Sequence, residues 1–461
     1  MAQALSPSAV VVATHKLKQY IAYYNKMKTT SIACGLLGLA LAAPAYSQTV
    51  VDITGATAFR SAAIAAIRAK FAAGGNYQYA HDAASGGVSG ANKAIFKGTF
   101  QGVNGETVVR CSWNGSVEGI RALVDTTYNP EYYQNVNGNF VTAPAANGGE
   151  THKDTVGFAK SVEASQSEIA FSDVTKNSTP FAASTLSPAS PQVGVVVFTM
   201  LTNEGSTITN VTSKQFRALF SNGSQPLSLF TGVTADESLV YAVGRNDGSG
   251  TRTAYLAETG YGITNPVNQF MITGGTTDTI TTLRKAAAGG VGSGANGVND
   301  STSASTVWGQ DIDGNGGYFS GSVIRGHMAK TAANVTVYDA NGTDVLQDGG
   351  KADLVTWITI SDAATARASG AVFCAFNGVK LDGIAASGTT LSAADKAKVT
   401  NGAYTAWGYQ QMYARNSSYS GNNRLVYDGI KAAIPANIGT AGIPVADMAV
   451  IRPSDGGVVA P

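Results

Sequence analysis

A glycine-punctuated loop at residues 244–252, GRNDGSGTR, is the segment of this sequence whose residue types and spacing best suit chemistry. The apolar run before it, at 239–243, predicts a buried strand, and the run after it, at 253–258, is compatible with a helix. Gly248 and Gly250 allow the backbone to approach a ligand closely. The free N–H groups of the first helical turn would then point toward that ligand. A strand, a glycine loop and a helix start together indicate a binding site for an anion.

Three polar side chains in this loop suit a tetrahedral oxyanion, and a fourth suits it only if the anion carries a proton. The hydroxyl groups of Ser249 and Thr251 can donate hydrogen bonds, and Arg245 supplies a planar guanidinium. Asp247 would repel an anion unless the ligand donates a proton to it, as hydrogen phosphate can and sulfate cannot. An ordinary helix cap with an Arg–Asp pair at the surface is the alternative that these residues leave open.

Three further predicted strands each end at a small hydroxyl or an acidic side chain. These residues, each with the strand that precedes it, are Thr57 (50–54), Ser116 (107–111) and Asp173 (168–171). Strands alternate with helices, such as the one expected from about Arg60 to Phe71, which predicts an α/β chain with mostly parallel sheets flanked by helices. Ligands in such folds bind at the carboxyl ends of strands, so these ends predict one convergent site.

In these motifs the sequence resembles the periplasmic phosphate-binding proteins of phosphate ABC importers, a class of type II periplasmic binding protein. The closest match is the loop at 245–251, to the pattern Arg-x-Asp-Gly-Ser-Gly-Thr. The segments that carry the resemblance run in order along nearly all of the mature chain. They are Ile53–Phe59, Gly115–Ile120, Phe171–Asp173, Val193–Leu201, Ile208–Thr212, Leu219–Gly223, Arg245–Thr251, Asp313–Gly317 and Ala352–Asp362.

The resemblance implies a two-lobed type II periplasmic-binding-protein fold that holds its ligand between the lobes. Lobe I would combine residues 49–192 with 353–461, and lobe II would span 193–352. The implied ligand is inorganic phosphate or a related oxyanion, with no cofactor and no catalysis. A membrane component of an ABC importer would be a compatible partner.

The resemblance also implies a set of ligand-binding residues. They are Thr57, Ala58, Ser116, Asp173, Arg245, Asp247, Ser249, Gly250 and Thr251. The hydroxyl groups of the two serines and of Thr251 would donate hydrogen bonds, as would the backbone N–H groups of Ala58 and Gly250. Arg245 would supply positive charge, and the two aspartates would accept a hydrogen bond or balance charge.

The sequence departs from the family pattern at three places. One extra residue stands between Gly55-Ala56 and Phe59, Arg60 replaces a proline, and Glu118 replaces a glycine. A carboxylate at Glu118 would weaken anion binding if it faced the pocket. If it pointed outward, it would only favour the helix N-terminus.

Composition excludes several function classes. The chain has 461 residues, a net charge of +1 and 13% charged residues, so no basic excess indicates nucleic acid or an anionic membrane as a partner. No metal-ligand spacing occurs, and Ser249 lies in no Gly-x-Ser-x-Gly elbow that a hydrolase would need. The alternative function is a non-transport extracellular structural or surface protein that keeps the fold with degenerate ligand binding. Low charge and long loops rich in Gly, Asn and Thr favour it.

The N-terminal region predicts export. Residues 1–48 are interpreted as an upstream segment plus a signal peptide, with Met27 as an alternative start and cleavage near Ala45–Ser47. A periplasmic or extracellular location follows, and an uncleaved membrane anchor is the alternative. Cys111 and Cys374 would remain after cleavage, either as a disulfide or as two buried free thiols.

The first prediction concerns this processing. We expect the exported protein to begin between Tyr46 and Thr49, because the small-residue cleavage sites lie there. Mass spectrometry of the periplasmic or secreted fraction measures the N-terminus directly. Peptides from residues 2–26 in that fraction would refute the prediction.

Overall fold

A computed structural model describes residues 48–83, 87–136, 149–153, 161–288, 291–292, 299–300, 307–383, 391–439 and 442–461. Except for Gln48, the predicted upstream segment and signal peptide lie outside the described residues. None of the described helices combines the length and the apolar character that a membrane span requires.

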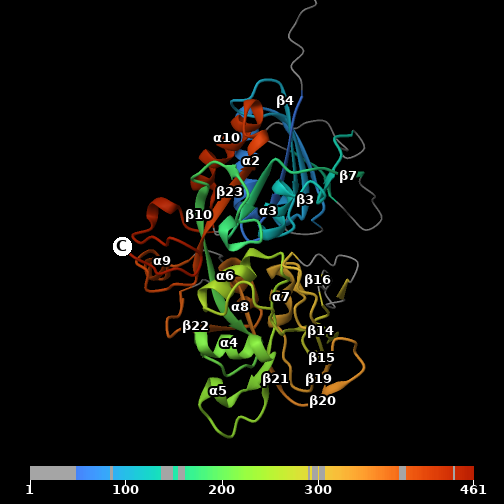
Figure 1. Ribbon diagram of the computed structural model, residues 1–461, viewed down its shortest axis with the longest axis vertical. Helices are drawn as coiled ribbons and strands as arrows, with labels where there is room; N and C mark the ends of the chain where they lie inside the picture. The colour runs from blue at the N-terminus through green and yellow to red at the C-terminus, as the bar shows by residue number, and fades with distance from the viewer. Residues whose placement is uncertain are drawn as a thin grey trace, which may run out of the picture. The chain divides into compact units, whose positions relative to one another are not determined.

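A large mixed sheet forms the centre of the fold (Figure 1). Its main path runs through β12 (Ser224–Pro226), β13 (Leu239–Ala242), β21 (Ala352–Thr359), β10 (Gln192–Thr202), β23 (Trp407–Arg415), β8 (Ile169–Ser172), β1 (Thr49–Gly55), β4 (Glu106–Ser112), β3 (Lys93–Thr99), β2 (Tyr77–His81) and β6 (Gly149–Lys153). Off this path, β22 (Val372–Phe376) pairs with β10 and β11 (Asn210–Val211), and β9 (Leu186–Ser187) pairs with β23.

Smaller sheets complete the described strands. One consists of β14 (Phe270–Gly275), β15 (Ile280–Lys285), β19 (Thr336–Tyr338) and β20 (Val345–Gln347). The others pair β16 (Val291–Gly292) with β17 (Asn299–Asp300) and β18 (Gly317–Tyr318), and β5 (Glu131–Tyr133) with β7 (Val162–Ala164).

Strand β10 joins two parts of the large sheet. Its first half, from Gln192 to Val197, pairs with β23, and its second half, from Phe198 to Thr202, pairs with β21. Ten of its eleven residues are buried, which explains the apolar run that predicted it. The division into lobes at residues 193 and 353 stays a prediction.

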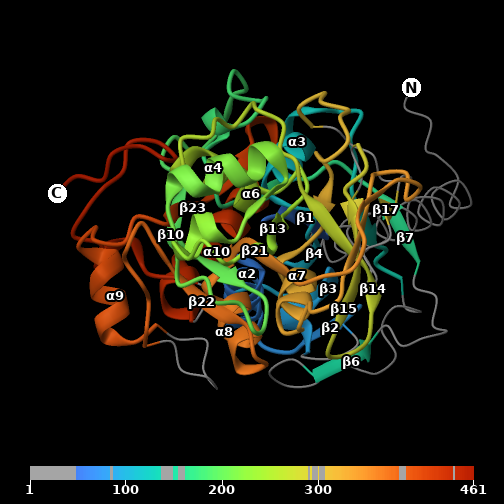
Figure 2. The same ribbon diagram turned by 90° about the horizontal axis from the view of Figure 1, so that it is seen from below.

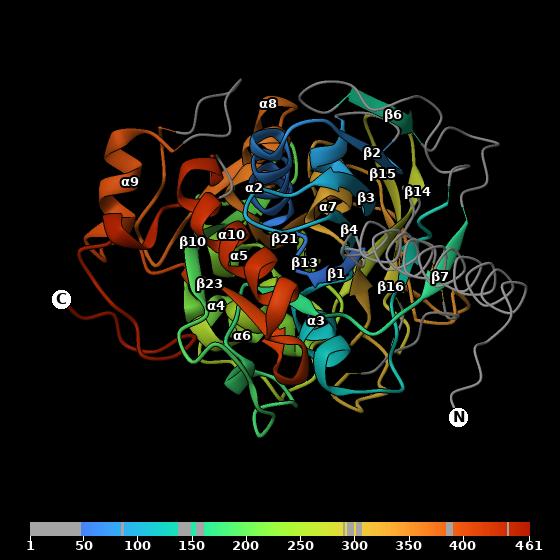
Figure 3. The ribbon, with the colours of Figure 1, turned by 90° about the horizontal axis from the view of Figure 1, so that it is seen from above.

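Helices flank the sheet. They are α2 (Arg60–Gly74), α3 (Ser116–Val124), α4 (Ser213–Asn222), α5 (Ser228–Thr231), α6 (Gly250–Glu258), α7 (Gly321–Met328), α8 (Ile360–Ala368), α9 (Ala393–Thr400) and α10 (Gly421–Asn437). Helices α2 and α10 pack side by side (Figure 3). Helix α4 packs on α6 through Phe216, whose ring centroid lies 5.0 Å from that of Tyr255 (Figure 2).

The structure confirms the α/β class with a large sheet flanked by helices. The expectation of mostly parallel sheets holds only in part, because β10 and β23 run antiparallel to their neighbours in this sheet. Parallel pairing is found where the candidate site lies, in the strand trio β4-β1-β8 and in the pair β13-β21.

The two described cysteines are free thiols. Cys111 lies in β4 and Cys374 in β22, and both are buried. The Cys374 thiol lies 3.2 Å from the carbonyl oxygen of Ile208. Burial raises the pKa of both thiols, to about 12 for Cys374.

The second prediction tests the close packing at the end of β1. Gly55 has φ +112°, and an added Cβ would stand 2.0 Å from the carbonyl oxygen of Phe171. Gly55→Ala should therefore lower the free energy of unfolding by about 3 kcal/mol, because steric overlap adds to backbone strain. Gly102 is the control, since its φ is +88° and nothing lies within 4 Å of an added Cβ. Denaturant unfolding of both variants gives the comparison, and equal losses would contradict the steric explanation.

Candidate functional site

Three parallel strands end together at one edge of the sheet. Strand β1 lies between β4 and β8, with Ile53 opposite both Cys111 and Ile169. The chain leaves these strands toward the residues that the sequence singled out, Thr57, Ser116 and Asp173. The backbone N–H of Asp173 donates to the Ser116 hydroxyl at 3.2 Å. Sheet geometry thus joins two of these residues directly.

The N-termini of helices α3 and α6 meet at this edge. The backbone N–H of Val117, in the first turn of α3, donates to the carbonyl oxygen of Gly248 at 3.0 Å. A Cβ added at Gly250 would stand 2.4 Å from the Ser116 Oγ and 2.5 Å from the Asp173 Oδ1. Only glycine can occupy position 250. Because it has no side chain, the loop after β13 packs closely against the residues that follow β4 and β8.

Arg245 reaches from this loop across the site. Its Nε donates to the carbonyl oxygen of Tyr318 at 3.0 Å, and its Nη2 donates to that of Phe319 at 2.6 Å. Its outer nitrogens make longer contacts, with the hydroxyl of Thr251 at 3.5 Å and that of Thr57 at 3.4 Å. Two backbone carbonyl groups hold the guanidinium, and its contacts with the two hydroxyl groups are weak.

A chain of hydrogen bonds joins the predicted residues. The Thr251 hydroxyl, which contacts Arg245, donates to the Asp173 Oδ2 at 3.1 Å. Asp173 connects in turn to Ser116. The structure therefore brings together Thr57, Ser116, Asp173, Arg245 and Thr251, with Gly250 packed against them.

The remaining predicted residues take other positions. The Ser249 hydroxyl caps α6 by accepting from the backbone N–H of Arg252 at 3.4 Å. Asp247 is buried, its Oδ2 has no hydrogen-bond partner, and Arg252 attracts its charge. Burial raises the pKa of Asp247, and Arg252 opposes that shift. Ala58 is half-buried in the turn before α2. The helix cap that the sequence left as an alternative is thus present, but Asp247 is buried and forms no ion pair among the described residues.

Arg252 belongs to the support of the site, and the sequence analysis did not select it. It is 3% exposed and donates to the carbonyl oxygens of Asn315 at 2.6 Å and of Arg245 at 3.4 Å. Gln269 donates to the same Arg245 carbonyl at 3.0 Å. The second arginine of the loop GRNDGSGTR and the segment Asp313–Gly317 were the available signals for this support.

Glu118, the departure that would weaken anion binding, is buried in the first turn of α3. Its Cγ lies 2.6 Å from the position of a Cβ added at Gly248. Its carboxylate lies 3.9 Å from Arg121 and is hydrogen-bonded to the Tyr128 side chain. The charge is therefore paired within and beside α3.

Burial sets the electrostatics of the site. Desolvation lowers the pKa of Arg245 to about 10 and raises the pKa of Asp173 to about 6, and mutual attraction opposes both shifts. Within the described ranges, the hydrogen-bond partners of Arg245 are two carbonyl oxygens and two hydroxyl groups, and it forms no ion pair. A buried cation with neutral partners is a costly arrangement that a bound anion would relieve.

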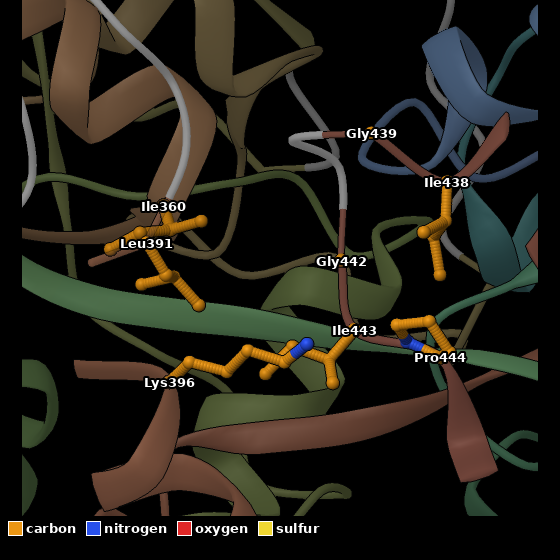
Figure 4. A pocket seen from close by; sticks show the side chains of 8 residues that line it. All are labelled: Ile360, Leu391, Lys396, Ile438, Gly439, Gly442, Ile443 and Pro444. Carbon is orange, nitrogen blue, oxygen red and sulfur yellow. The ribbon is translucent and has the colours of Figure 1, made fainter. Parts of the chain in front are cut away.

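A separate cavity lies elsewhere in the described chain (Figure 4). It measures about 260 Å³ and is lined by apolar side chains such as Ile360, Leu391 and Ile443. Its one charged lining residue, Lys396, pairs with Asp447 at 2.6 Å. No residue of the predicted ligand set lines this cavity.

Comparison with known proteins finds similarity at the level of solved structures. No family model and no curated protein matches the chain. A protein assigned as a phosphate ABC transporter substrate-binding protein from Clostridium perfringens, with bound phosphate, matches at TM-score 0.42 and 12% identity, covering 86% of this chain and 100% of its own. An ABC-type phosphate transport receptor from Vibrio cholerae matches at TM-score 0.38 and 11% identity, covering 83% and 94%. A phosphate-binding protein from Stenotrophomonas maltophilia matches at TM-score 0.32 and 12% identity, covering 86% and 90%.

The third prediction concerns Asp173. Its pKa is raised in the folded state, so its contribution to stability is complete below about pH 4 and is lost as the pH rises through about 6. Relative to Asp173→Asn, the unmutated protein should lose on the order of 2 kcal/mol of unfolding free energy between about pH 4.5 and about pH 7.5. Denaturant unfolding in buffers free of oxyanions measures this. Parallel pH profiles for the two proteins would contradict it.

Proposed function

We propose that this chain is an exported solute-binding protein that captures inorganic phosphate or a related tetrahedral oxyanion. The observation that carries the proposal is the buried guanidinium of Arg245, which is 2% exposed and has only neutral hydrogen-bond partners within the described chain. Asp173 and Asp362 attract the guanidinium without bonding to it, and an oxyanion beside it would supply a directly bound negative partner.

The surrounding donors favour an oxyanion over a carboxylate or a halide. The nitrogens Nη1 and Nη2 of Arg245 form a fork that contacts the hydroxyl groups of Thr251 and Thr57, and the Ser116 hydroxyl joins the same network through Asp173. The N-terminus of α6 adds partial positive charge, whereas the first N–H groups of α3 donate to the carbonyl oxygen of Gly248. Donors from several directions match the oxygens of a tetrahedron better than those of a planar group.

We further propose a division of labour between the two buried carboxylates. Asp173 lies in the network and would accept a hydrogen bond from the protonated oxygen of hydrogen phosphate. Sulfate has no such proton, so its oxygen and the carboxylate would be two acceptors facing each other. Asp247, beside Arg252, would balance the charge of that second arginine. Selectivity for a protonated oxyanion would then depend mainly on Asp173.

The proposal includes the two-lobed arrangement and the location. Thr57, Ser116 and Asp173 would belong to lobe I, and Arg245 and Thr251 to lobe II, so the lobes would close on the anion. The protein would act in the periplasm or outside the cell and deliver the anion to an ABC importer.

The fourth prediction tests binding. Phosphate at a hundred times its dissociation constant should stabilise the mature protein by roughly 2.7 kcal/mol, and sulfate should do so only at much higher concentration. Arg245→Ala should weaken phosphate binding at least a hundredfold, because the variant loses the guanidinium that contacts the hydroxyl groups of Thr57 and Thr251. Calorimetry and thermal unfolding of protein freed of bound ligand provide the measurements.

Arg217→Ala is the matched control, since Arg217 is an exposed arginine of α4. It should leave the phosphate affinity unchanged. If phosphate gives neither heat nor a shift in melting temperature, the binding proposal fails, and the structural or surface role becomes the better explanation.

A further inference from the structure

The C-terminal segment contacts both sides of the candidate site. We define the C-terminal strap as residues 449–461, all of which the structure describes. We infer that this strap fastens α6 to the loop after β8 and thereby limits how fast an oxyanion leaves the site. The inference rests on the proposed function for its ligand, but the fastening itself can be tested without any ligand.

One anchor joins the strap to the end of α6. Arg452 pairs with Glu258, the last residue of α6, at 2.9 Å, and the two side chains are only 4% and 9% exposed. Arg452 also donates to the carbonyl oxygen of Thr405 at 2.8 Å and lies 4.6 Å from the ring centroid of Trp407. The end of α6 is thus tied to the start of β23 through one buried guanidinium.

A second anchor joins the strap to the loop that carries Asp173. The Asp455 carboxylate accepts from the Thr175 backbone N–H at 2.8 Å and from its hydroxyl at 2.9 Å. The next residue, Gly456, lies directly against α6, since an added Cβ would stand 2.4 Å from the Ala257 carbonyl oxygen. Two consecutive residues of the strap therefore hold the Asp173 loop and α6 together.

The strap is itself an ordered part of the fold. Ile451 and Ala460 exchange backbone hydrogen bonds of 2.7 and 3.0 Å, which close the segment on itself. The Ala449 N–H donates to the Thr400 carbonyl oxygen at 2.9 Å, beside α9 (Figure 1). The buried side chain of Val450 belongs to the main hydrophobic core. The strap can therefore resist a displacement of α6.

Ligand exchange requires such a displacement. Ser116, Asp173, Arg245 and Thr251 are each at most 2% exposed, so an anion cannot reach them unless a wall of the site moves. Thr251 stands at the beginning of α6, and Glu258 stands at its end. Moving α6 away from Asp173 would break the Arg452–Glu258 pair or the Asp455–Thr175 bonds. The strength of these contacts then sets the release rate.

The fifth prediction uses Asp455→Ala and Glu258→Gln, with Asp447→Ala as the control. Asp447 is an acidic residue near the strap, paired with Lys396 at the surface and not attached to α6. Both strap variants should release radiolabelled phosphate at least tenfold faster than the unmutated protein, and the control should not. For Asp455, the direction of the change in release rate distinguishes the loss of the strap contact from the loss of a negative charge. The negative charge of Asp455 disfavours negative charge at Asp173. It would repel a bound anion in the same way, so its removal on electrostatic grounds alone would slow the release of the anion.

Hydrogen exchange on ligand-free protein separates the two proposals. The amides of α6 should exchange faster in both strap variants, and those of α2 should keep their rates. Faster α6 exchange without any phosphate binding in the unmutated protein would support the strap and refute the phosphate proposal. Unchanged α6 exchange, or an unchanged release rate in folded variants that bind phosphate, would overturn the strap. Circular dichroism confirms folding, and Asp455→Asn serves if Asp455→Ala does not fold.

Discussion

The burial of one guanidinium constrains the whole site. Arg245 is held on its inner side by the carbonyl oxygens of Tyr318 and Phe319, which fix its plane. Its outer side meets only hydroxyl groups within the described chain. Desolvating a cation costs several kcal/mol unless charge or good hydrogen bonds compensate it. The fold tolerates this cost because strand ends and helix starts from distant parts of the chain surround the same point.

Glycine residues allow the close packing of the site because they have no side chain. Gly250 leaves room for Ser116 and Asp173, and Gly115 lies so close to Gly248 that an added Cβ would stand 2.7 Å from its carbonyl oxygen. These contacts let two helix N-termini approach each other, which few side chains would permit. Arg252 also supports the loop, because it donates to the carbonyl oxygens of Arg245 and Asn315.

Local patterns made much of this arrangement predictable. Apolar runs predicted β1, β4, β8, β10 and β13, and glycine loops predicted the starts of α3 and α6, because these signals lie within a few adjacent residues. The convergence of Thr57, Ser116 and Asp173 followed from the rule for parallel strands. The carbonyl groups that hold Arg245 could not be predicted, since any residue has one. The insertion of β23 between β10 and β8 was also invisible, because pairing partners so far apart in sequence leave no local pattern.

The position of β23 in the sheet has a consequence for how the chain folds. This strand is made of residues Trp407–Arg415, yet it is the only link along the main path of the described sheet between β8, formed early in the chain, and β10. The central sheet therefore cannot be completed until residues 407–415, near the end of the polypeptide, have been synthesised. Contacts of such long sequence separation fold slowly. The junction between the two parts of the sheet is therefore expected to form late in folding.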